Sequence, residues 1–220
     1  MDKIDIDEIQ KKLTAGIIGK TLICLETAES TNTYASGLIR GINNIAQLPD
    51  YNGIVVISET QTAGRGRFDR KWLSPMGGIW MTILLQPPLE IQDLSKMTLL
   101  SSSAIIETLV KNYKIRLNVK WPNDIYFNTK KLSGILAESE KINDKTYLII
   151  GMGINANNDF GNYKNENLNA VSLKEITGMQ INRNFLIAEI LNEFEAQYIY
   201  YIKTLDFKGI FKKIENIMIY

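Results

Sequence analysis

The sequence predicts an α+β fold in which a mostly antiparallel or mixed sheet has helices packed on one face. Three observations predict it. Apolar, β-branched runs of strand length recur between residues 21 and 154. Turn-forming triplets at 128–130 and 143–145 separate consecutive runs, as they do at hairpin tips. Stretches with helical periodicity lie between and after the runs, so helices are expected to cover the sheet.

Seven runs rich in aliphatic and aromatic residues predict the strands. They are 21–26, 53–58, 78–87, 115–121, 124–128, 131–139 and 146–154. The last run is apolar almost throughout. We predict it as a candidate sheet edge through which the chain forms a homodimer, because an unpaired apolar edge invites partners.

Three stretches predict helices from their caps and periodicity. Cap residues at 30–32 begin a helix through Ile39, Ser95 caps a helix from Lys96 to about Tyr113, and Asn182 begins a long third helix. The third helix carries a periodic apolar face that is expected to pack on the core: Phe185, Leu186, Ile190, Phe194, Tyr198 and Ile202.

Two segments carry no clear pattern of this kind. Residues 155–170 are rich in Asn and Gly and predict a long surface loop. Residues 204–220 alternate Lys with Ile and Phe, and they either close the domain or begin a unit that the chain does not finish.

The charge balance limits the classes of function. Lys and Arg total 25 and Asp and Glu total 24, which gives a net charge of +1 over 220 residues. Proteins that bind mainly to nucleic-acid backbones usually carry a stronger basic excess. We therefore expect no DNA partner. No apolar run approaches about 18 residues, so no membrane partner is expected either.

The chain contains no histidine and one cysteine, Cys24. The lack of histidine excludes a Ser-His-Asp triad, a Cys-His pair and histidine metal sites. A single cysteine excludes an internal disulfide and favours a cytoplasmic protein. Catalysis would have to use lysine, arginine, carboxylates, backbone amides or a bound cation.

A basic, glycine-containing stretch, QTAGRGRFDRKW, follows the second predicted strand at residues 61–72. Gly64 and Gly66 allow the backbone amides to point at one anion. Arg65, Arg67 and Arg70 add planar donors that match phosphate or carboxylate oxygens. The alternative is a solvated basic turn or an Arg-Gly patch for RNA.

Two further motifs place polar groups at strand ends. In KWPNDI (120–125), Pro122 fixes an extended bend, and Asn123 and Asp124 are able to hold a base, a sugar or hydrated Mg²⁺. A turn with an Asx cap is the commoner structure for such a segment. In KKLSGILAE (130–138), lysines precede an apolar strand in which Gly134 permits close approach of a ligand or chain.

The segment GMGIN (151–155) looks like half of a dinucleotide-binding fingerprint. It lacks the third glycine and the following helix, so a Rossmann interpretation is not favoured. Asn155 at the end of this strand is a candidate contact for an adenine edge.

In this order and spacing, the motifs resemble the biotin protein ligase family over roughly residues 20–200. The matching segments are EST-N at 29–32, Q-TxGRGR-x-x-R-x-W at 61–72, KWPND at 120–124, KLxGIL-E at 131–138 and GxGIN at 151–155. The resemblance implies one catalytic domain, 1–220, of the class II synthetase-like biotin/lipoate ligase fold. It also implies that biotin and ATP, with Mg²⁺, form biotinyl-5′-AMP, from which biotin passes to a lysine of a biotin carboxyl carrier protein.

The resemblance also implies roles for individual residues. Catalytic roles fall to Lys131, Arg65 and Arg67. Biotin contacts fall to Ser30, Thr31, Asn32, Gln61, Gly64, Arg65, Gly66, Arg67, Lys131 and Gly134. Nucleotide contacts fall to Arg65, Arg67, Trp72, Asn123, Asp124, Lys131 and Asn155. The metal ligands are not identified, and Asp124, acting through water, is the candidate.

The chain departs from the family pattern at both ends, and one of its loops is expected to respond to ligand. The ligase pattern starts early in the sequence, so the N-terminal winged-helix DNA-binding domain of some relatives is expected to be absent. Few residues follow the last predicted helix, so the C-terminal SH3-like barrel of many relatives is expected to be absent or supplied by another chain. The loop 63–71 is expected to be mobile without ligand and ordered with it.

Three alternatives remain open. Lipoate ligases of the same fold usually carry a motif that ends in histidine, which this chain lacks. Octanoyl transferases use a cysteine late in the domain, whereas Cys24 lies in an early strand and is expected to be a small, buried apolar residue. A single-stranded RNA-binding module would explain the Arg-Gly loop but not KWPND or Lys131.

Overall fold

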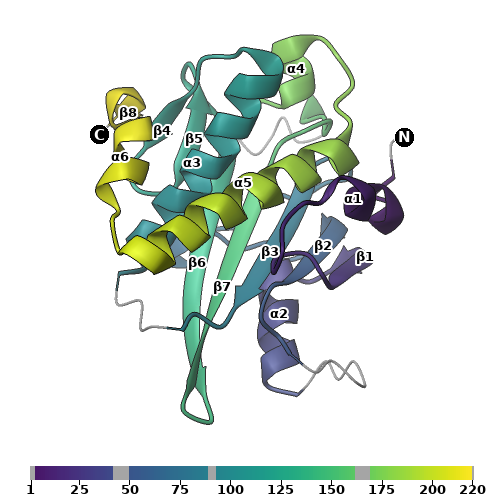
Figure 1. Ribbon diagram of the computed structural model, residues 1–220. Coiled ribbons are helices and arrows are strands. Elements are labelled where there is room, and N and C mark those ends of the chain that lie inside the picture. Colours follow the sequence, from purple (N-terminus) through teal and green to yellow (C-terminus); the bar gives the residue numbers. More distant parts are fainter. Residues whose placement is uncertain (1–2, 42–49, 89–92, 162–168, 220) are drawn as a thin grey trace.

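The computed structural model describes residues 3–41, 50–88, 93–161 and 169–219 (Figure 1). Its centre is an eight-stranded mixed sheet in the order β1-β2-β3-β7-β6-β5-β4-β8. The strands are β1 (Leu22–Ala28), β2 (Ile54–Gln61), β3 (Ile79–Leu85), β4 (Asn118–Lys120), β5 (Asp124–Phe127), β6 (Lys130–Ile142), β7 (Lys145–Ile154) and β8 (Met218–Ile219). β1 pairs with β2 and β4 with β8 in parallel, and the other pairs are antiparallel. The predicted α+β class and mixed sheet are confirmed.

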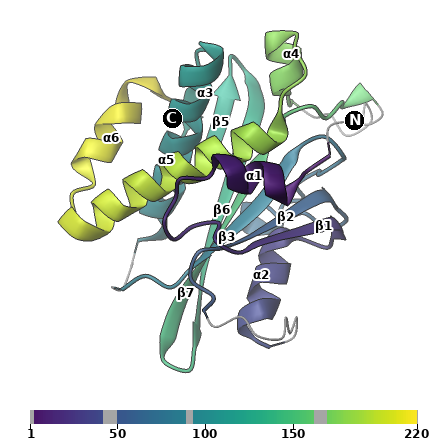
Figure 2. The ribbon, with the colours of Figure 1, turned by 45° about the vertical axis from the view of Figure 1, so that its right-hand side comes forward.

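Six α-helices lie around the sheet in the described residues. They are α1 (Ile6–Lys12), α2 (Thr31–Ile39), α3 (Leu94–Tyr113), α4 (Leu173–Thr177), α5 (Arg183–Thr204) and α6 (Lys208–Ile214). In both ribbon views α1, α3 and α5 lie together, whereas α2 lies apart from them towards the lower edge (Figures 1 and 2). None of the helices in these ranges has the length and apolar character that a membrane crossing requires.

The prediction that all helices cover one face of the sheet is wrong for α2. The larger apolar core packs α3, α5 and α6 against one face of the sheet. A smaller core lies on the other face, where Ala35 and Leu38 of α2 contact Val56, Leu84 and Ile149. Successive strand residues point to opposite faces, so a short helix between two parallel strands can cover the second face.

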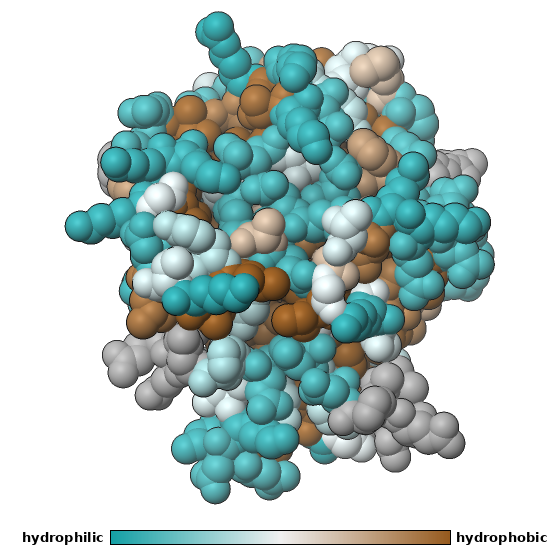
Figure 3. Space-filling model, viewed as in Figure 1, coloured by the Kyte–Doolittle hydropathy of each residue, from teal (hydrophilic) through white to brown (hydrophobic). Residues whose placement is uncertain are grey.

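The long helices begin where short polar side chains cap them. Asn182 accepts a hydrogen bond from the Phe185 amide at 2.9 Å and begins α5 as predicted. For α3 the cap is Asp93 rather than Ser95, because the Asp93 carboxylate accepts from the Ser95 amide at 2.9 Å. The view of this side shows hydrophilic residues over most of the face, with apolar patches between them (Figure 3).

The ends of the chain add elements that the sequence patterns did not reveal. Asp5 caps α1, in which only Ile9 is buried, so no periodic apolar face marks this helix in the sequence. After α6, the short strand β8 pairs in parallel with β4 and extends the sheet. The final segment therefore closes this side of the sheet.

The prediction that strand 146–154 forms a sheet edge is wrong. β7 lies between β3 and β6 and is hydrogen-bonded to both along its length. Its apolar run reflects burial on both faces, and it does not offer an unpaired edge. A homodimer would have to form through another surface, and the oligomeric state stays a prediction.

The Asn-rich segment 155–170 is only partly a surface loop. Asn155, Ala156 and Asn158 are buried, and Asn157 exchanges two hydrogen bonds with the backbone of Ile181, each 2.8 Å long. Residues 162–168 of this prediction lie outside the described residues. Short polar side chains that bond to backbone therefore bury the start of a segment that its composition marks as solvated.

Candidate functional site

A cavity of about 320 Å³ opens on the α2 face of the sheet, opposite α3 and α5. Its volume suits a small organic ligand. The described residues that line it are Ser30, Thr31, Asn32, Gln61, Arg65, Gly66, Arg67, Phe68, Arg70, Lys71, Trp72, Trp80, Met81, Lys120, Trp121, Asn123, Asp124, Tyr126, Lys131, Gly134, Ile135, Leu136, Gly151, Met152 and Gly153. The cavity thus joins α2, the ends of central strands and the loop after β2.

Glycines on adjacent strands form the floor of the cavity. Gly153 pairs with Gly134 across β7 and β6, and Gly151 lies two residues along the same face. A Cβ at Gly153 would lie 2.6 Å from the Trp72 indole nitrogen, and one at Gly151 would collide with the Asn32 amide. Because glycine has no Cβ, Trp72 can pack directly on Gly153 and Asn32 directly on Gly151.

A hydrogen-bond network fixes the start of α2 at the cavity wall. The Gln61 side-chain oxygen accepts from the Thr31 amide at 2.8 Å, which satisfies one of the first N–H groups of the helix. The buried Thr82 hydroxyl lies 2.7 Å from both the Thr31 hydroxyl and the Asn32 side-chain oxygen. The Gln61 side-chain nitrogen donates to Ser74 at 2.6 Å, which ties this wall to the loop after β2.

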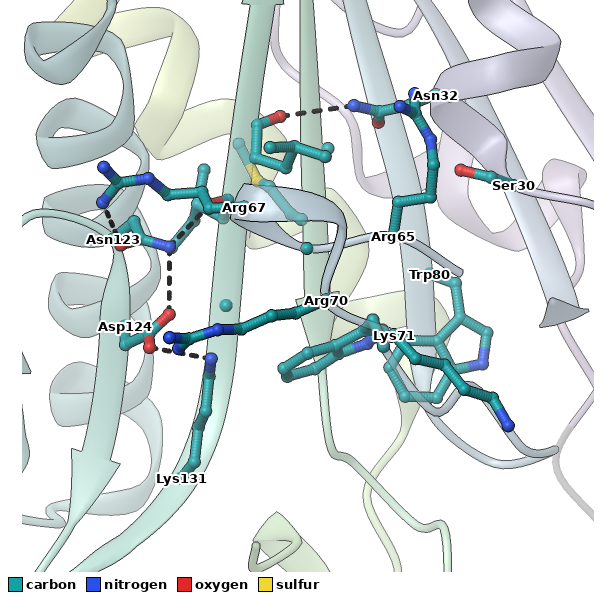
Figure 4. Close-up of a pocket in the computed structure, with 18 of the residues that line it drawn as sticks. Ser30, Asn32, Arg65, Arg67, Arg70, Lys71, Trp80, Asn123, Asp124 and Lys131 are labelled. Carbon is teal, nitrogen blue, oxygen red and sulfur yellow. Dashed lines mark hydrogen bonds and ion pairs between the residues drawn. The ribbon is translucent and has the colours of Figure 1, made fainter. Parts of the chain in front are cut away.

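We call residues 62–73 the arginine loop. It folds back on itself, since the Gly66 amide donates to the Arg70 carbonyl at 2.7 Å and the Trp72 amide to the Gly64 carbonyl at 2.8 Å. Figure 4 shows the loop crossing the cavity, with Arg65 extending towards Asn32 and Arg67 extending towards Asn123. That ligand binding orders this loop stays a prediction.

A chain of polar contacts crosses the cavity from Arg67 to Lys131 (Figure 4). Arg67 donates to the Asn123 side-chain oxygen at 3.1 Å, and the Asn123 amide donates to Asp124 at 3.1 Å. The Asp124 carboxylate then lies 2.8 Å from the Lys131 ammonium. Asp124 of the KWPND motif and Lys131 of the KLxGIL motif therefore form an ion pair, in which the carboxylate positions the lysine.

An aromatic ring borders the same ammonium. The Lys131 nitrogen lies 4.9 Å from the centre of the Trp72 ring, a distance at which the ring face attracts a cation. Trp72 packs edge-on against Trp80 with ring centres 6.3 Å apart. The Trp72 indole N–H is buried and has no protein hydrogen-bond acceptor among the described residues, so it is a donor that a ligand could use.

The lining charges of the cavity are strongly unbalanced. Asp124 is the only acidic residue among the described lining residues, which include six basic ones. Those basic residues are Arg65, Arg67, Arg70, Lys71, Lys120 and Lys131. The whole chain carries a net charge of only +1, so its positive charge is concentrated where a ligand would lie. Such a cavity favours an anion that carries more than one charge.

The structure brings nearly all the predicted site residues to this cavity. The two exceptions are Gly64 and Asn155. Gly64 lies behind the lining, where a Cβ would approach the Ser74 hydroxyl to 2.7 Å. Asn155 is 2% exposed, and its side chain bonds to the Lys131 carbonyl and to Asn158 instead of facing the cavity. Asn155 thus supports the backbone of Lys131.

Several lining residues were not predicted. Gly151 and Gly153 belong to the GMGIN segment, where alternate glycines in a strand signal space on one face. Trp80, Trp121 and Tyr126 come from strands or strand ends whose residue types also suit a core. Burial first, and then the Asp124 charge, raise the pKa of the Tyr126 phenol, so this residue is a neutral hydroxyl at pH 7.

The donor set suits a metal that arrives with its ligand. No group of three carboxylate or cysteine side chains that could hold an ion occurs in the described residues. Asp124 is already bonded to Lys131 and Asn123. Mg²⁺ commonly keeps several waters and uses one or two carboxylates together with substrate phosphates. One carboxylate in a cavity for an anion fits that mode.

Cys24 lies far from this chemistry. It is half-buried in β1, and it packs against the larger core on the opposite face of the sheet. Burial, followed by the charge of Glu59, raises the pKa of the thiol above its ordinary value. A raised pKa reduces the thiolate population, so Cys24 is a poor nucleophile at pH 7.

Comparison with known proteins agrees with the motifs. Residues 25–155 match the biotin/lipoate A/B protein ligase family, and the chain belongs to that family. Within it, the resemblance to the biotin protein ligases is confirmed. The chain is 36% identical to the bifunctional ligase/repressor BirA of Bacillus subtilis, over 89% of this chain and 59% of that protein.

Solved structures give the same result. The chain is 33% identical to the biotin protein ligase from Aquifex aeolicus in complex with biotin and ATP, with a TM-score of 0.76 over 91% of this chain and 79% of that one. Human biotin–protein ligase is 32% identical over 71% of this chain but only 22% of its own length. The chain thus spans less than two thirds of the length of the Bacillus subtilis and human relatives.

Proposed function

We propose that this protein is an ATP-dependent biotin–protein ligase. It activates biotin as biotinyl-5′-AMP and transfers the biotinyl group to a lysine of a biotin carboxyl carrier protein. The observation that carries the proposal is the meeting of five sequence motifs around one positively charged cavity, with Lys131 held 2.8 Å from Asp124. The relatives named as biotin ligases add support, one of them solved with biotin and ATP.

In the first step, a biotin carboxylate oxygen attacks the α-phosphorus of ATP. A new O–P bond forms, the bond between the α-phosphorus and the bridging oxygen breaks, and pyrophosphate leaves. The carboxylate is ionised at pH 7, so this step requires no general base. It requires that two anions be brought together, and Lys131, Arg65 and Arg67 supply positive charge for that purpose.

Different walls of the cavity contact different parts of the ligand. The network at the start of α2, with Ser30, Thr31 and Gln61, provides hydroxyl and amide groups for the polar ureido end of biotin. Trp72 and the glycine floor border the nucleotide. Asp124 would hold Mg²⁺, directly or through water, and the ion would offset phosphate charge when bound.

In the second step, the amine of a carrier lysine attacks the acyl carbon of the mixed anhydride. An amide bond forms, the bond from the acyl carbon to the phosphate oxygen breaks, and AMP leaves. The attacking amine must be neutral, so it loses a proton before or during this step. With a single half-buried cysteine, the chain suits the reducing cytoplasm in which such carriers would be modified.

The test is incubation of the protein with ATP, Mg²⁺ and biotin, followed by mass spectrometry for biotinyl-AMP and pyrophosphate. Addition of a carrier domain should then give a mass increase of one biotinyl group on one lysine. The same reaction with lipoate or octanoate tests the alternatives of the same fold. Product from lipoate but none from biotin would reject the proposal in favour of a lipoate ligase.

The RNA-binding alternative has its own measurement. The Arg-Gly segment of such a module would face solvent, whereas Arg65 and Arg67 here bond to Glu138 and Asn123. Filter binding against mixed-sequence RNA at physiological salt should show no retention. Retention at micromolar protein, together with no adenylate, would favour the RNA-binding class.

A further inference from the structure

We propose that Glu138 is a positioning residue that ties the arginine loop to the start of α2. This inference rests on the function proposed above. Glu138 lies in β6 and is not among the described residues that line the cavity. It therefore acts on the ligand only through the residues that it holds.

One carboxylate oxygen of Glu138 accepts from both sides of the cavity. The Arg65 guanidinium donates to it at 3.0 Å, and the Asn32 side-chain amide donates to it at 2.8 Å. Arg65 belongs to the arginine loop, and Asn32 belongs to the first turn of α2. A single atom therefore joins these two walls, in addition to the Gln61 side chain that bonds to Thr31 and Ser74.

The contact also fixes which way the Asn32 amide faces. Its nitrogen donates to Glu138 and to the Leu136 carbonyl at 3.4 Å, while its oxygen accepts from Thr82 at 2.7 Å. Without Glu138, the amide nitrogen would lose its shorter bond in a site where Asn32 is 4% exposed. A buried donor that loses its partner is costly, so the first turn of α2 would shift.

The second consequence concerns Arg65. Its side chain is 42% exposed and that of Glu138 is 32% exposed, so water screens their ion pair only in part. Arg65 lies in a cavity with five other basic lining residues. Without the Glu138 charge, these cations would repel one another, and the loop would leave its closed position more often.

β6 supplies a matched control in Glu140, two residues along the same face. The Ser36 hydroxyl donates to Glu140 at 2.6 Å and the Arg40 guanidinium at 2.8 Å, and both residues lie on or directly after α2. Glu140 thus helps to hold the same helix, but its hydrogen bonds do not reach the arginine loop. Glu140 interacts with the Arg65 charge only through space, without a hydrogen bond, so comparison of the two glutamates isolates the direct contact of Glu138 with the loop.

The first experiment needs no ligand. Limited trypsin digestion of the wild type, Glu138→Gln and Glu140→Gln, with mass spectrometry of the fragments, gives the cleavage rate after Arg65. We expect Glu138→Gln to raise this rate about fivefold or more, because the neutral side chain holds the Arg65 guanidinium less strongly. Glu140→Gln should leave the rate within about twofold. Equal rates for the two variants would overturn the proposal.

The second experiment measures biotin affinity by calorimetry and adenylate formation in single turnover. Glu138→Gln should weaken biotin binding about tenfold, with a smaller loss in the rate of the chemical step. Glu138→Asp should restore part of the affinity because it keeps the charge. An unchanged biotin Kd in Glu138→Gln would overturn the proposal.

The two proposals fail in different ways. If the wild type binds no biotin, the proposed function is wrong, whereas the trypsin comparison still decides the role of Glu138. If Glu138→Gln does not fold, as judged by circular dichroism, Glu138→Asp serves in both experiments. In Glu138→Asp, the shorter side chain should raise cleavage after Arg65 above the wild-type rate, and an unchanged rate would overturn the proposal.

Discussion

Lys131 is the residue on which the proposed chemistry depends most directly. Its ammonium lies 2.8 Å from Asp124 and 4.9 Å from the Trp72 ring, so its position is set before any ligand arrives. Lys130, one residue earlier, is exposed at the hairpin tip. Two adjacent lysines therefore differ completely in surroundings, because successive strand residues point to opposite faces.

We predict that Lys131→Ala lowers the rate of adenylate formation by roughly two orders of magnitude or more, on the scale of losing a donor that stabilises developing negative charge. Lys130→Ala should change the rate by less than about twofold, since surface changes have small effects. Release of labelled pyrophosphate measures both. A larger loss in Lys130→Ala would show that the motif is assigned one residue out of place.

At the residue scale, the sequence predicted about half of the described cavity lining, because family motifs fix residue types that face the ligand. It did not predict Glu138 as a contact of Arg65, although Glu138 belongs to the KLxGIL-E motif, because its partners lie 73 and 106 residues away. Asn155 was assigned to the nucleotide for a related reason. A strand-end asparagine can face either a ligand or the backbone, and here it bonds to the Lys131 carbonyl.

Among the elements, β7 matters most for the shape of the site. Its GMG segment places Gly151 and Gly153 on the cavity face. The sequence pattern did not show why glycine is needed at these two positions, and the fold does. Trp72 lies over Gly153, and Asn32 lies over Gly151. A glycine signals space, but only the fold shows which distant side chain fills it.

Gly153→Ala tests this floor. The new Cβ would lie 2.6 Å from the Trp72 indole nitrogen, so the indole must move. Overpacking of this kind costs about 1–3 kcal/mol, and we expect the KM for ATP to rise by about fivefold or more. In Gly134→Ala the nearest Trp72 atom is at 3.1 Å, so a smaller increase is expected. Equal, wild-type KM values for both variants would show that Trp72 does not border the nucleotide.

The arginine loop combines two glycines with three arginines, which led to the prediction that ligand orders it. The pairing of Arg65 with Glu138 opposes the charge repulsion behind that prediction. We nevertheless expect trypsin to cut at Arg65, Arg67 or Arg70 in the free protein, and several times more slowly with biotin and ATP present. Equal cleavage with and without ligands would mean that the loop is already ordered when empty.

The same loop is expected to retain the labile intermediate. Arg67 reaches across the cavity to Asn123, so its loss should open the site without removing Lys131. We expect Arg67→Gly to form adenylate but to release it, so that free biotinyl-AMP accumulates in solution as the anhydride escapes its shielded position. If Arg67→Gly released no more free biotinyl-AMP than the wild type, the loop would not retain the intermediate.

The attachment of α2 to β6 provides a pH-dependent contribution to stability. Burial raises the pKa of Glu140, but hydrogen bonds from Arg40 and Ser36, together with the charges of Arg40 and Arg65, outweigh it, so the folded-state pKa lies below its ordinary value. A lowered pKa means that the contribution is present above the unfolded-state pKa and is lost as the pH falls through the folded-state pKa. The charge of this carboxylate therefore stabilises the fold at neutral pH and not in acid.

We predict that Glu140→Gln lowers the free energy of unfolding by up to about 1 kcal/mol at pH 7, as expected for a partly exposed ion pair. The difference from the wild type should shrink as the pH falls through the lowered folded-state pKa of Glu140, and it should disappear once the wild-type carboxyl is protonated. Urea unfolding followed by circular dichroism at several pH values measures it. A difference that stays constant as the pH falls into the acid range would assign the effect to packing instead of charge.

For the whole molecule, the strand runs and long helices could be predicted from periodicity, whereas the sheet order could not. Strand order depends on contacts between distant segments, so β7 was assigned to an edge although it lies between β3 and β6. The position of α2 on the second face was not predicted either, because it also depends on contacts between distant segments. The burial of β7 leaves its GMG segment inside the sheet, where one face packs on the core and the other forms the cavity floor.

The distribution of charge over the whole molecule gives the last prediction. The chain is nearly neutral at +1, yet the described lining of its cavity holds six basic residues and one acid. Salt screens such a local field, since the Debye length falls from about 10 Å at 0.1 M to about 3 Å at 1 M. We therefore expect added NaCl to raise the KM for ATP several-fold, to raise that for the singly charged biotin less, and to change the Tm of the free protein little. Steady-state kinetics and thermal unfolding from 0.05 to 0.5 M NaCl measure all three, with KCl and potassium glutamate as controls for specific ion effects. Equal salt dependence for ATP and biotin would mean that the basic lining residues do not act together on the polyphosphate.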